Sequence, residues 1–462
     1  MKNSEKYAIF SSLICVLTAY AYAHDGIMIW LTHVFLLAGS GFYLWMIFNK
    51  TYEKEKEPVF STKALDLLTM LAISSLTLCL IGKTKSPSDY LWLCSSLSIF
   101  LTTKTRIEYL KFPNGKNQML LGILSSNLGP GLIILYCLWL GMVNALNGQT
   151  TNQQIPYYLS LTFIAICLAA ISKNQKYKLT MVTTMVMAIL AATFHRFIGI
   201  EFWSMLPIIN YKNFVAIIGL LAFSMLQTLE KSRTTLTLST LTSICLLINP
   251  SLLGRVGILL LWAIVFWLKI PAFLETKGVN WASGRLAKKI HTLIPLLLAA
   301  LTIITLTPKI EDISLLLGKN DNLNGRLDVW NTSMNWIKES PLLGNGPNFW
   351  YERGTIAVHN TGNQGHRPRG FNAILDTSVQ SGIIASVLLC LAFLMSLKNT
   401  SLTYREKYLL CSGLFLSFLT ETHSFMGIPP NLGEGILVTW LGFVWSATLV
   451  LPKPEEKTIT TA

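Results

Sequence analysis

The sequence predicts an all-α protein: a polytopic membrane helical bundle of about 12–14 transmembrane helices, with one long outer loop that contains a surface helix. Three observations lead to this prediction. Of the 462 residues, 52% are hydrophobic, only 13% are charged, and the mean hydropathy is +0.49, whereas about 25% of the residues in soluble domains are charged. The apolar residues form long blocks, and most basic residues lie between blocks on one side.

Each block approaches the length of about 20 residues that a helix needs to cross a bilayer core roughly 30 Å thick. The blocks at 90–103 and 408–420 are short, so we accept twelve to fourteen spans. The first block lacks a convincing small-residue cleavage site, which favours a retained helix over a signal peptide. In chain order, the expected spans are 7–23, 26–48, 65–82, 90–103, 118–143, 157–172, 180–194, 213–227, 235–249, 256–269, 291–307, 373–397, 408–420 and 432–450.

The basic residues then indicate the topology, because cytoplasmic loops carry an excess of Lys and Arg. With both termini in the cytoplasm, the inner segments hold 25 of the 37 basic residues. Seven of the other twelve lie in one long loop, 308–371, where the rule applies weakly. The net charge of +14 is therefore a signal of topology, and it does not indicate nucleic-acid binding. The expected organisation is a helical bundle over 1–307, the loop, and C-terminal helices with a short cytoplasmic tail over 372–462.

The cysteines point neither to disulfides nor to a metal site. All eight fall within apolar blocks, and the sequence contains no CxxC pair and no Cys/His spacing typical of zinc sites. Motifs for metal-assisted sugar transfer, nucleotide hydrolysis and serine hydrolysis are also missing. We therefore expect no metal and no cofactor.

The 308–371 loop is too long to be a simple connection in a compact protein, so we expect it to be functional. Its apolar residues show helical spacing, as in Leu327, Trp330, Met334 and Ile337. We interpret this pattern as an amphipathic helix on the outer membrane surface. Ser340-Pro341 should end the helix, and Gly344-Asn345-Gly346-Pro347 should form a turn.

Two arginines on the outer side are candidates for binding an anion. Arg255 begins the tenth span, where a positive charge runs against the topology rule. Arg326 opens the surface helix, and its guanidinium can hold two phosphate oxygens at once. Each arginine also has an alternative role that involves no bound ligand. Arg255 would extend to lipid headgroups, and Arg326 would pair with a nearby aspartate.

The twelfth span begins with a polar stripe. Asn372, Asp376 and Gln380 are four residues apart, which places them on one face of a helix. Polar groups entering an apolar span usually face a bundle interior or a wet cavity, and they indicate a functional site. Hydrogen bonding between helices is the alternative. Arg196 beside His195, and His423 near Glu421, are weaker candidates, because a wetted helix end explains each pair.

Taken together, Arg255, Gly325-Arg326-Leu327-Asp328-Val329-Trp330, the stretch from Pro341 to Phe349, and a span that opens with Asn372 and Asp376 resemble the O-antigen ligase/polymerase superfamily. The resemblance covers roughly 250–390. It implies a multi-pass protein of the bacterial inner membrane whose long loop is periplasmic. It also implies metal-independent transfer of an oligosaccharide from undecaprenyl diphosphate to an acceptor, either lipid A-core (ligase) or a lipid-linked glycan (polymerase).

Carried over to this chain, the resemblance implies that Arg255 and Arg326 bind the donor diphosphate. Arg369 and Arg196 are further candidates for the same role from their place in the sequence. Asn372, Gln380 and Trp330 would contact the glycan in the cavity. Phe371 stands where the ligases usually have a histidine, so Asp376 and His366 are the remaining candidates for the base. A ligase and a polymerase both remain open, and the departure weighs more against the ligase.

A transporter or flippase of a lipid-linked saccharide is the alternative function. Transporters tend to show repeated halves, broken helices and ionisable groups at the bilayer midplane. The expected spans of this chain are nearly free of charge at their centres, and the polar groups gather at the outer ends and in the loop. The sequence therefore favours the transferase.

Overall fold

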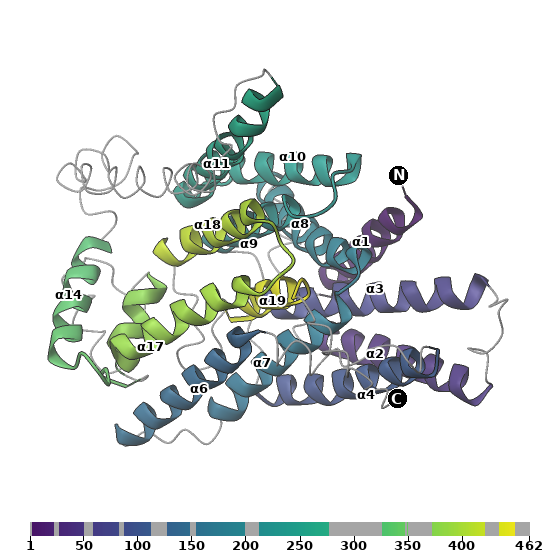
Figure 1. The fold of residues 1–462 in the computed structure, drawn as a ribbon, viewed down its shortest axis with the longest axis horizontal. Coiled ribbons are helices and arrows are strands. Elements are labelled where there is room, and N and C mark those ends of the chain that lie inside the picture. Colours follow the sequence, from purple (N-terminus) through teal and green to yellow (C-terminus); the bar gives the residue numbers. More distant parts are fainter. Residues whose placement is uncertain are drawn as a thin grey trace, which may run out of the picture.

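A computed structural model describes most of the chain as a bundle of helices (Figure 1). It describes residues 2–22, 27–49, 59–82, 87–111, 127–147, 154–198, 212–276, 326–346, 349, 372–420 and 434–448. The helices are α1 (Asn3–Tyr22), α2 (Ile27–Phe48), α3 (Val59–Ile81), α4 (Pro87–Lys111), α6 (Leu128–Leu146), α7 (Gln154–Ile171), α8 (Gln175–Ile198), α9 (Lys212–Leu226), α10 (Arg233–Ile248), α11 (Leu252–Thr276), α14 (Arg326–Glu339), α17 (Ala373–Lys398), α18 (Tyr404–Thr420) and α19 (Glu434–Trp445).

The all-helical prediction is confirmed for this part of the chain. A helix covers most of thirteen of the expected spans, and the span 291–307 and the part of 118–143 before Asn127 lie outside the described residues. Within the described residues, five helices are long and apolar enough to cross a membrane: α2, α3, α6, α8 and α17. Long apolar faces remain exposed on several helices, as at Trp30 and Val34 of α2, which is what contact with lipid requires.

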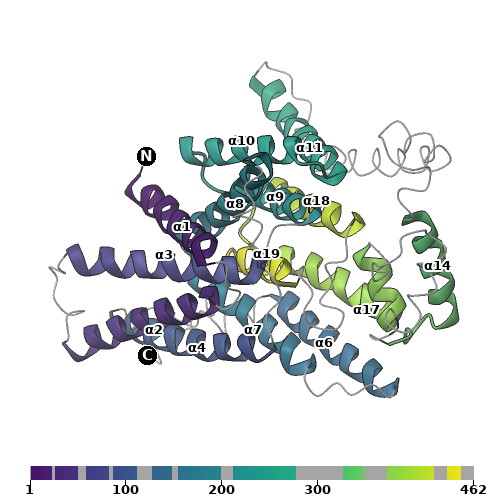
Figure 2. The same ribbon diagram turned by 180° about the vertical axis from the view of Figure 1, so that it is seen from behind.

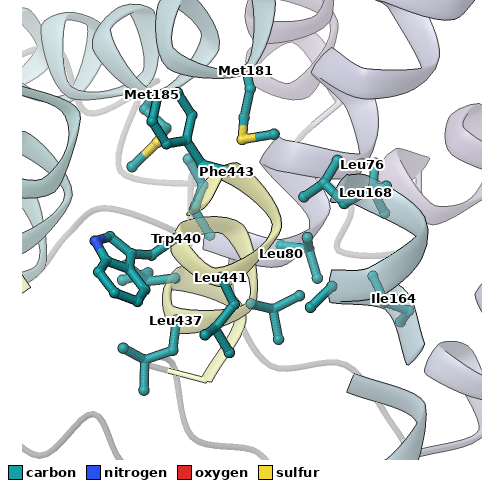
Figure 3. Packing of buried hydrophobic residues seen from close by; sticks show 14 of the residues in the cluster. Leu76, Leu80, Ile164, Leu168, Met181, Met185, Leu437, Trp440, Leu441 and Phe443 are labelled. Atoms are coloured by element: carbon teal, nitrogen blue, oxygen red, sulfur yellow. The ribbon is translucent and has the colours of Figure 1, made fainter. Parts of the chain in front are cut away.

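The last expected span, 432–450, ends earlier than predicted. α19 ends at Trp445, and Thr448 pairs with Thr400 in an isolated β-bridge. α19 lies inside the bundle, where Trp440, Leu441 and Phe443 pack among side chains of α3, α7 and α8 (Figure 3). A helix that is apolar all round belongs in such an interior.

One end of the bundle is held together by polar contacts between the starts of helices. At the starts of α3 and α8, the Asp66 carboxylate accepts hydrogen bonds from Lys176 Nζ at 2.5 Å and from the Tyr177 hydroxyl at 2.8 Å. The starts of α1 and α10 are joined by the Thr234 hydroxyl, which donates to the Glu5 carboxylate at 3.0 Å. The charge pattern predicts that all four of these starts share one side of the membrane, and the fold brings them together in these two pairs.

Glu5 is the best-defined titratable group at this end. Burial acts to raise the pKa of its carboxyl. Hydrogen bonds from Ser232, Thr234 and the backbone N–H of Lys2 outweigh burial, so the pKa lies below its ordinary value. The carboxylate therefore stabilises the contact between α1 and α10 as long as it stays ionised.

The opposite end carries the surface helix. Figures 1 and 2 show α14 lying crosswise to α3 at the end of the bundle away from the start of α1, and it packs against α17. α14 ends at Glu339, directly before Ser340-Pro341, as predicted. The packed face differs from the predicted stripe, because Val329, Ser333 and Ile337 are buried while Met334 is half-exposed. The helix turns these residues inward because it rests on α17.

Candidate functional site

The candidate site is built on the start of α17, where Asn372 caps the helix. Its Oδ1 accepts hydrogen bonds from the backbone N–H groups of Ile374 and Leu375 at 3.0 and 3.1 Å. This contact satisfies two of the donors that every helix start leaves open. The Asn372 oxygen therefore has a structural role that the spacing argument did not predict, and only its amide N–H groups remain for a ligand.

Asp376 and Gln380 lie one and two turns further along, on the face that their spacing predicts. Their side chains are 1% and 3% exposed, so both are buried in the bundle. Asp376 lies in the first turn, where the positive end of the helix dipole stabilises a carboxylate. Gln380 Oε1 has no hydrogen-bond partner among the described residues, although it is fully shielded from solvent. A buried acceptor of this kind suits a donor that comes from a water or a ligand.

α17 is broken directly after this face. Ser381 (φ −134°, ψ 17°) and Gly382 (φ 78°, ψ 170°) leave the helical conformation, and the helix resumes at Ile383. A break of this kind frees backbone carbonyls in the middle of a span. One of them, the Ser381 carbonyl, accepts a hydrogen bond from Trp139 Nε1 of α6 at 3.0 Å.

The turn after α14 bonds to further backbone groups around the break. Asn345 N–H donates to the Val379 carbonyl at 2.8 Å, Gly346 N–H donates to the Gln380 carbonyl at 2.9 Å, and Ile383 N–H donates to the Pro341 carbonyl at 2.8 Å. Three main-chain hydrogen bonds thus join two segments about 35 residues apart in the chain. They fix the turn after α14 to α17.

Two glycines make this close approach possible. A Cβ on Gly382 would overlap the carbonyl oxygen of Leu342, and a Cβ on Gly344 would overlap the backbone of Gln380 and Ser381. Both glycines also have positive φ, at 78° and 69°. Only glycine combines this backbone conformation with this packing.

Aromatic packing strengthens the same junction. The rings of Trp336 and Phe349 meet edge to face, with their centroids 4.6 Å apart. They form a small cluster with Val329, Ile337 and Val379, which buries apolar surface between α14 and α17. Trp330 lies on the same helix and is half-buried.

Arg255 lies at the start of α11 beside a short turn. Its Nε donates to the carbonyl of Asn249, the C-cap of α10, at 2.9 Å. The turn is itself tied to α9, because the Ser251 hydroxyl donates to Asn213 Oδ1 at 2.8 Å. The bond from Arg255 Nε to the Asn249 carbonyl orients the guanidinium. It leaves the two terminal nitrogens, with four N–H groups, for an acceptor such as an anion.

The structure brings some of the predicted site residues together and says less of the others. α14, which begins at Arg326, packs against α17, which carries Asp376 and Gln380. α11, which carries Arg255, packs against α9, α10 and α18 instead. Arg196 and Arg326 lie on described helices, but their side chains are outside the described part. His366 and Arg369, and also Glu421 and His423, fall outside the described residues altogether.

Sequence reasoning missed the break in α17 and the residues that support it. The adjacent Ser381 and Gly382 inside an apolar block were a usable signal, since Gly/Ser pairs are common at helix kinks. Nothing local marked Trp139, because it lies 242 residues away from the carbonyl that it meets. Among the described residues, no group of three or more His, Cys, Asp or Glu side chains is placed to hold a metal ion.

No protein-family model matches the chain, and no curated protein sequence is significantly similar to it.

Proposed function

We propose that the protein is a multi-pass glycosyltransferase of the bacterial inner membrane, with 12–14 spans, cytoplasmic termini and a periplasmic long loop. It would transfer an oligosaccharide from undecaprenyl diphosphate to an acceptor sugar, either lipid A-core or a lipid-linked glycan. The observation that carries this proposal is the buried Asp376, held in a half-helix to which the arginine-bearing loop is bonded. The turn that follows the arginine-bearing helix α14 and the helix that carries the acid are thereby bonded to each other.

In the proposed reaction, an acceptor hydroxyl oxygen attacks the anomeric carbon of the donor sugar. A new C–O bond forms there while the bond from that carbon to the diphosphate oxygen breaks. The hydroxyl proton passes to the Asp376 carboxylate, which acts as general base. Negative charge grows on the leaving diphosphate, and Arg255 and Arg326 would stabilise it.

The roles proposed from the sequence also stay for Arg196 and Arg369 as diphosphate ligands, His366 as a second candidate base and Trp330 as a glycan contact. Gln380 would accept a hydrogen bond from a sugar hydroxyl, which its unpartnered buried oxygen supports.

Transport of a lipid-linked saccharide is the second candidate, because α17 is broken as transporter helices often are. In transporters the freed carbonyls bind the ion or substrate. Here the carbonyls of Val379, Gln380 and Ser381 accept hydrogen bonds from the protein's own donors. This occupancy favours the transferase.

Purified protein in vesicles with undecaprenyl-diphosphate oligosaccharide tests the proposal. A transferase yields a longer glycan or a lipid A-core conjugate, and its activity survives EDTA. Arg255→Ala and Arg326→Ala should each abolish transfer, whereas the exposed controls Arg405→Ala and Lys338→Ala should leave it unchanged. Movement of the lipid between leaflets without any glycan product would show that the protein is a transporter instead.

A further inference from the structure

The turn Pro341–Gly346 contacts α17 more than two helical turns after the start of that helix. The break at Ser381–Gly382 begins nine residues into a helix of 26 residues. At 1.5 Å per residue, the break lies roughly 13 Å from the start of a helix about 39 Å long. A bilayer core is only about 30 Å thick, so a centred α17 places the break on the order of 10 Å inside the hydrocarbon.

Two leucines of this turn are exposed. Leu342 is 61% exposed and Leu343 is 38% exposed. Next to them, the second half of α17 exposes an apolar stripe at helical spacing: Ile383, Val387, Leu391 and Leu394. The hydrogen bond from Ile383 N–H to the Pro341 carbonyl joins the turn to the beginning of this stripe. The two exposed leucines and the exposed stripe of α17 therefore lie on segments that are bonded to each other.

Several polar groups of the turn are hydrogen-bonded within the protein. Gly344 N–H donates to the Ser340 carbonyl at 3.0 Å, and the Ser340 hydroxyl donates to the Gly344 carbonyl at 2.8 Å. The bonds to α17 occupy the Asn345 and Gly346 N–H groups and the Pro341 carbonyl. Non-helical backbone is tolerated at membrane depth only when protein or water satisfies it in this way.

We propose that Pro341–Gly346 is a re-entrant segment of the long loop, and that Leu342 and Leu343 contact lipid acyl chains in the leaflet on the side of α14. We assign lipid acyl chains as the contact of the two leucines because the leucines adjoin the exposed apolar stripe of α17, a proposed membrane span. The outward face of α14 is different in character, since it exposes Asn331 and Lys338 and suits water or headgroups. The inference rests on the membrane placement proposed above and not on the transferase chemistry.

Fluorescence quenching tests the depth of the turn. An environment-sensitive fluorescent amino acid replaces Leu342 in the full-length protein, which is reconstituted into phosphatidylcholine vesicles with brominated acyl chains. Matched probes replace Val387, on the lipid-facing stripe of α17, and Asn331, on the exposed face of α14. We expect brominated lipid to quench the probes at Leu342 and Val387 to a similar extent. Aqueous iodide should quench mainly the probe at Asn331.

The proposal would be overturned if iodide quenched the probe at Leu342 as strongly as it quenches the probe at Asn331. Quenching by neither agent would do the same, because it would mean that protein covers the turn. If the probe at Leu342 prevents folding, the less exposed Leu343 provides a second position with the same expected outcome. The readout needs no enzymatic activity, so a failed transferase assay and a failed depth measurement remain distinct.

Discussion

Replacing Gly382 by alanine should break the junction between α17 and the long loop. The residue has φ 78° and ψ 170°, a region that residues with a side chain essentially never occupy. The added methyl group would also overlap the Leu342 carbonyl oxygen. The turn therefore has to move away from α17, or α17 has to straighten, and either change separates the bonded segments.

The cost follows from the contacts that are lost. Strain at such a backbone position is worth about 1–3 kcal/mol. The three main-chain hydrogen bonds between the turn and α17 are worth roughly 0.5–1.5 kcal/mol each. Gly382→Ala should therefore lower the free energy of unfolding by about 3–7 kcal/mol, provided that all three bonds are lost.

Equilibrium unfolding of the purified protein in mixed micelles, followed by tryptophan fluorescence, measures this change. Gly131→Ala is the matched control, because Gly131 lies on an exposed face of α6 with no atom within 4 Å of an added Cβ. Alanine should be neutral there, or stabilising by up to about 1 kcal/mol, as expected for an exposed helical position. If the two variants unfold alike, neither the strain nor the bonded turn at Gly382 governs stability, and the reasoning is refuted.

Three further predictions concern single side chains. Trp139→Phe removes the donor to the Ser381 carbonyl and should lower the free energy of unfolding by about 1–3 kcal/mol, measured in the same micelles. Glu5→Gln should remove an acid-sensitive part of the stability. In the wild type, the lowered pKa of Glu5 contributes to the free energy of unfolding, and this contribution is complete above the ordinary carboxyl pKa. It is lost as the pH falls through the lowered folded-state pKa. The free energy of unfolding, measured from pH 6 down to pH 3, should therefore decline less in the variant than in the wild type. Asp376→Asn should slow glycan transfer by about 10²-fold or more if Asp376 is the base, with the protein still inserted in the membrane.

Each of these variants has an exposed counterpart. Trp92→Phe on α4, Glu230→Gln beside α10 and Glu339→Gln at the end of α14 repeat the same chemical changes outside the buried contacts. Equal effects in a variant and its counterpart would contradict the assigned contact. For Asp376, nearly unchanged transfer would leave His366 as the candidate base.

The sequence by itself determined where most of the helices lie, α14 included. Apolar blocks and helical periodicity are local properties, so thirteen of the expected spans, the end of α14 at Ser340-Pro341 and the turn at Gly344 could be read directly. The common side of Asn372, Asp376 and Gln380 also follows from spacing alone. The end of α19 at Trp445 was not predictable in this way, because it depends on how the helix packs inside the bundle.

Only the tertiary structure decided what these residues meet. The break in α17 exists because donors from Asn345, Gly346 and Trp139 satisfy the carbonyls that it frees. Those donors come from segments about 35 and 242 residues away, and the break is stable only with its partners in place. Hydrogen-bond satisfaction in a buried site is a property of the assembled bundle, so no local pattern of residues could reveal it.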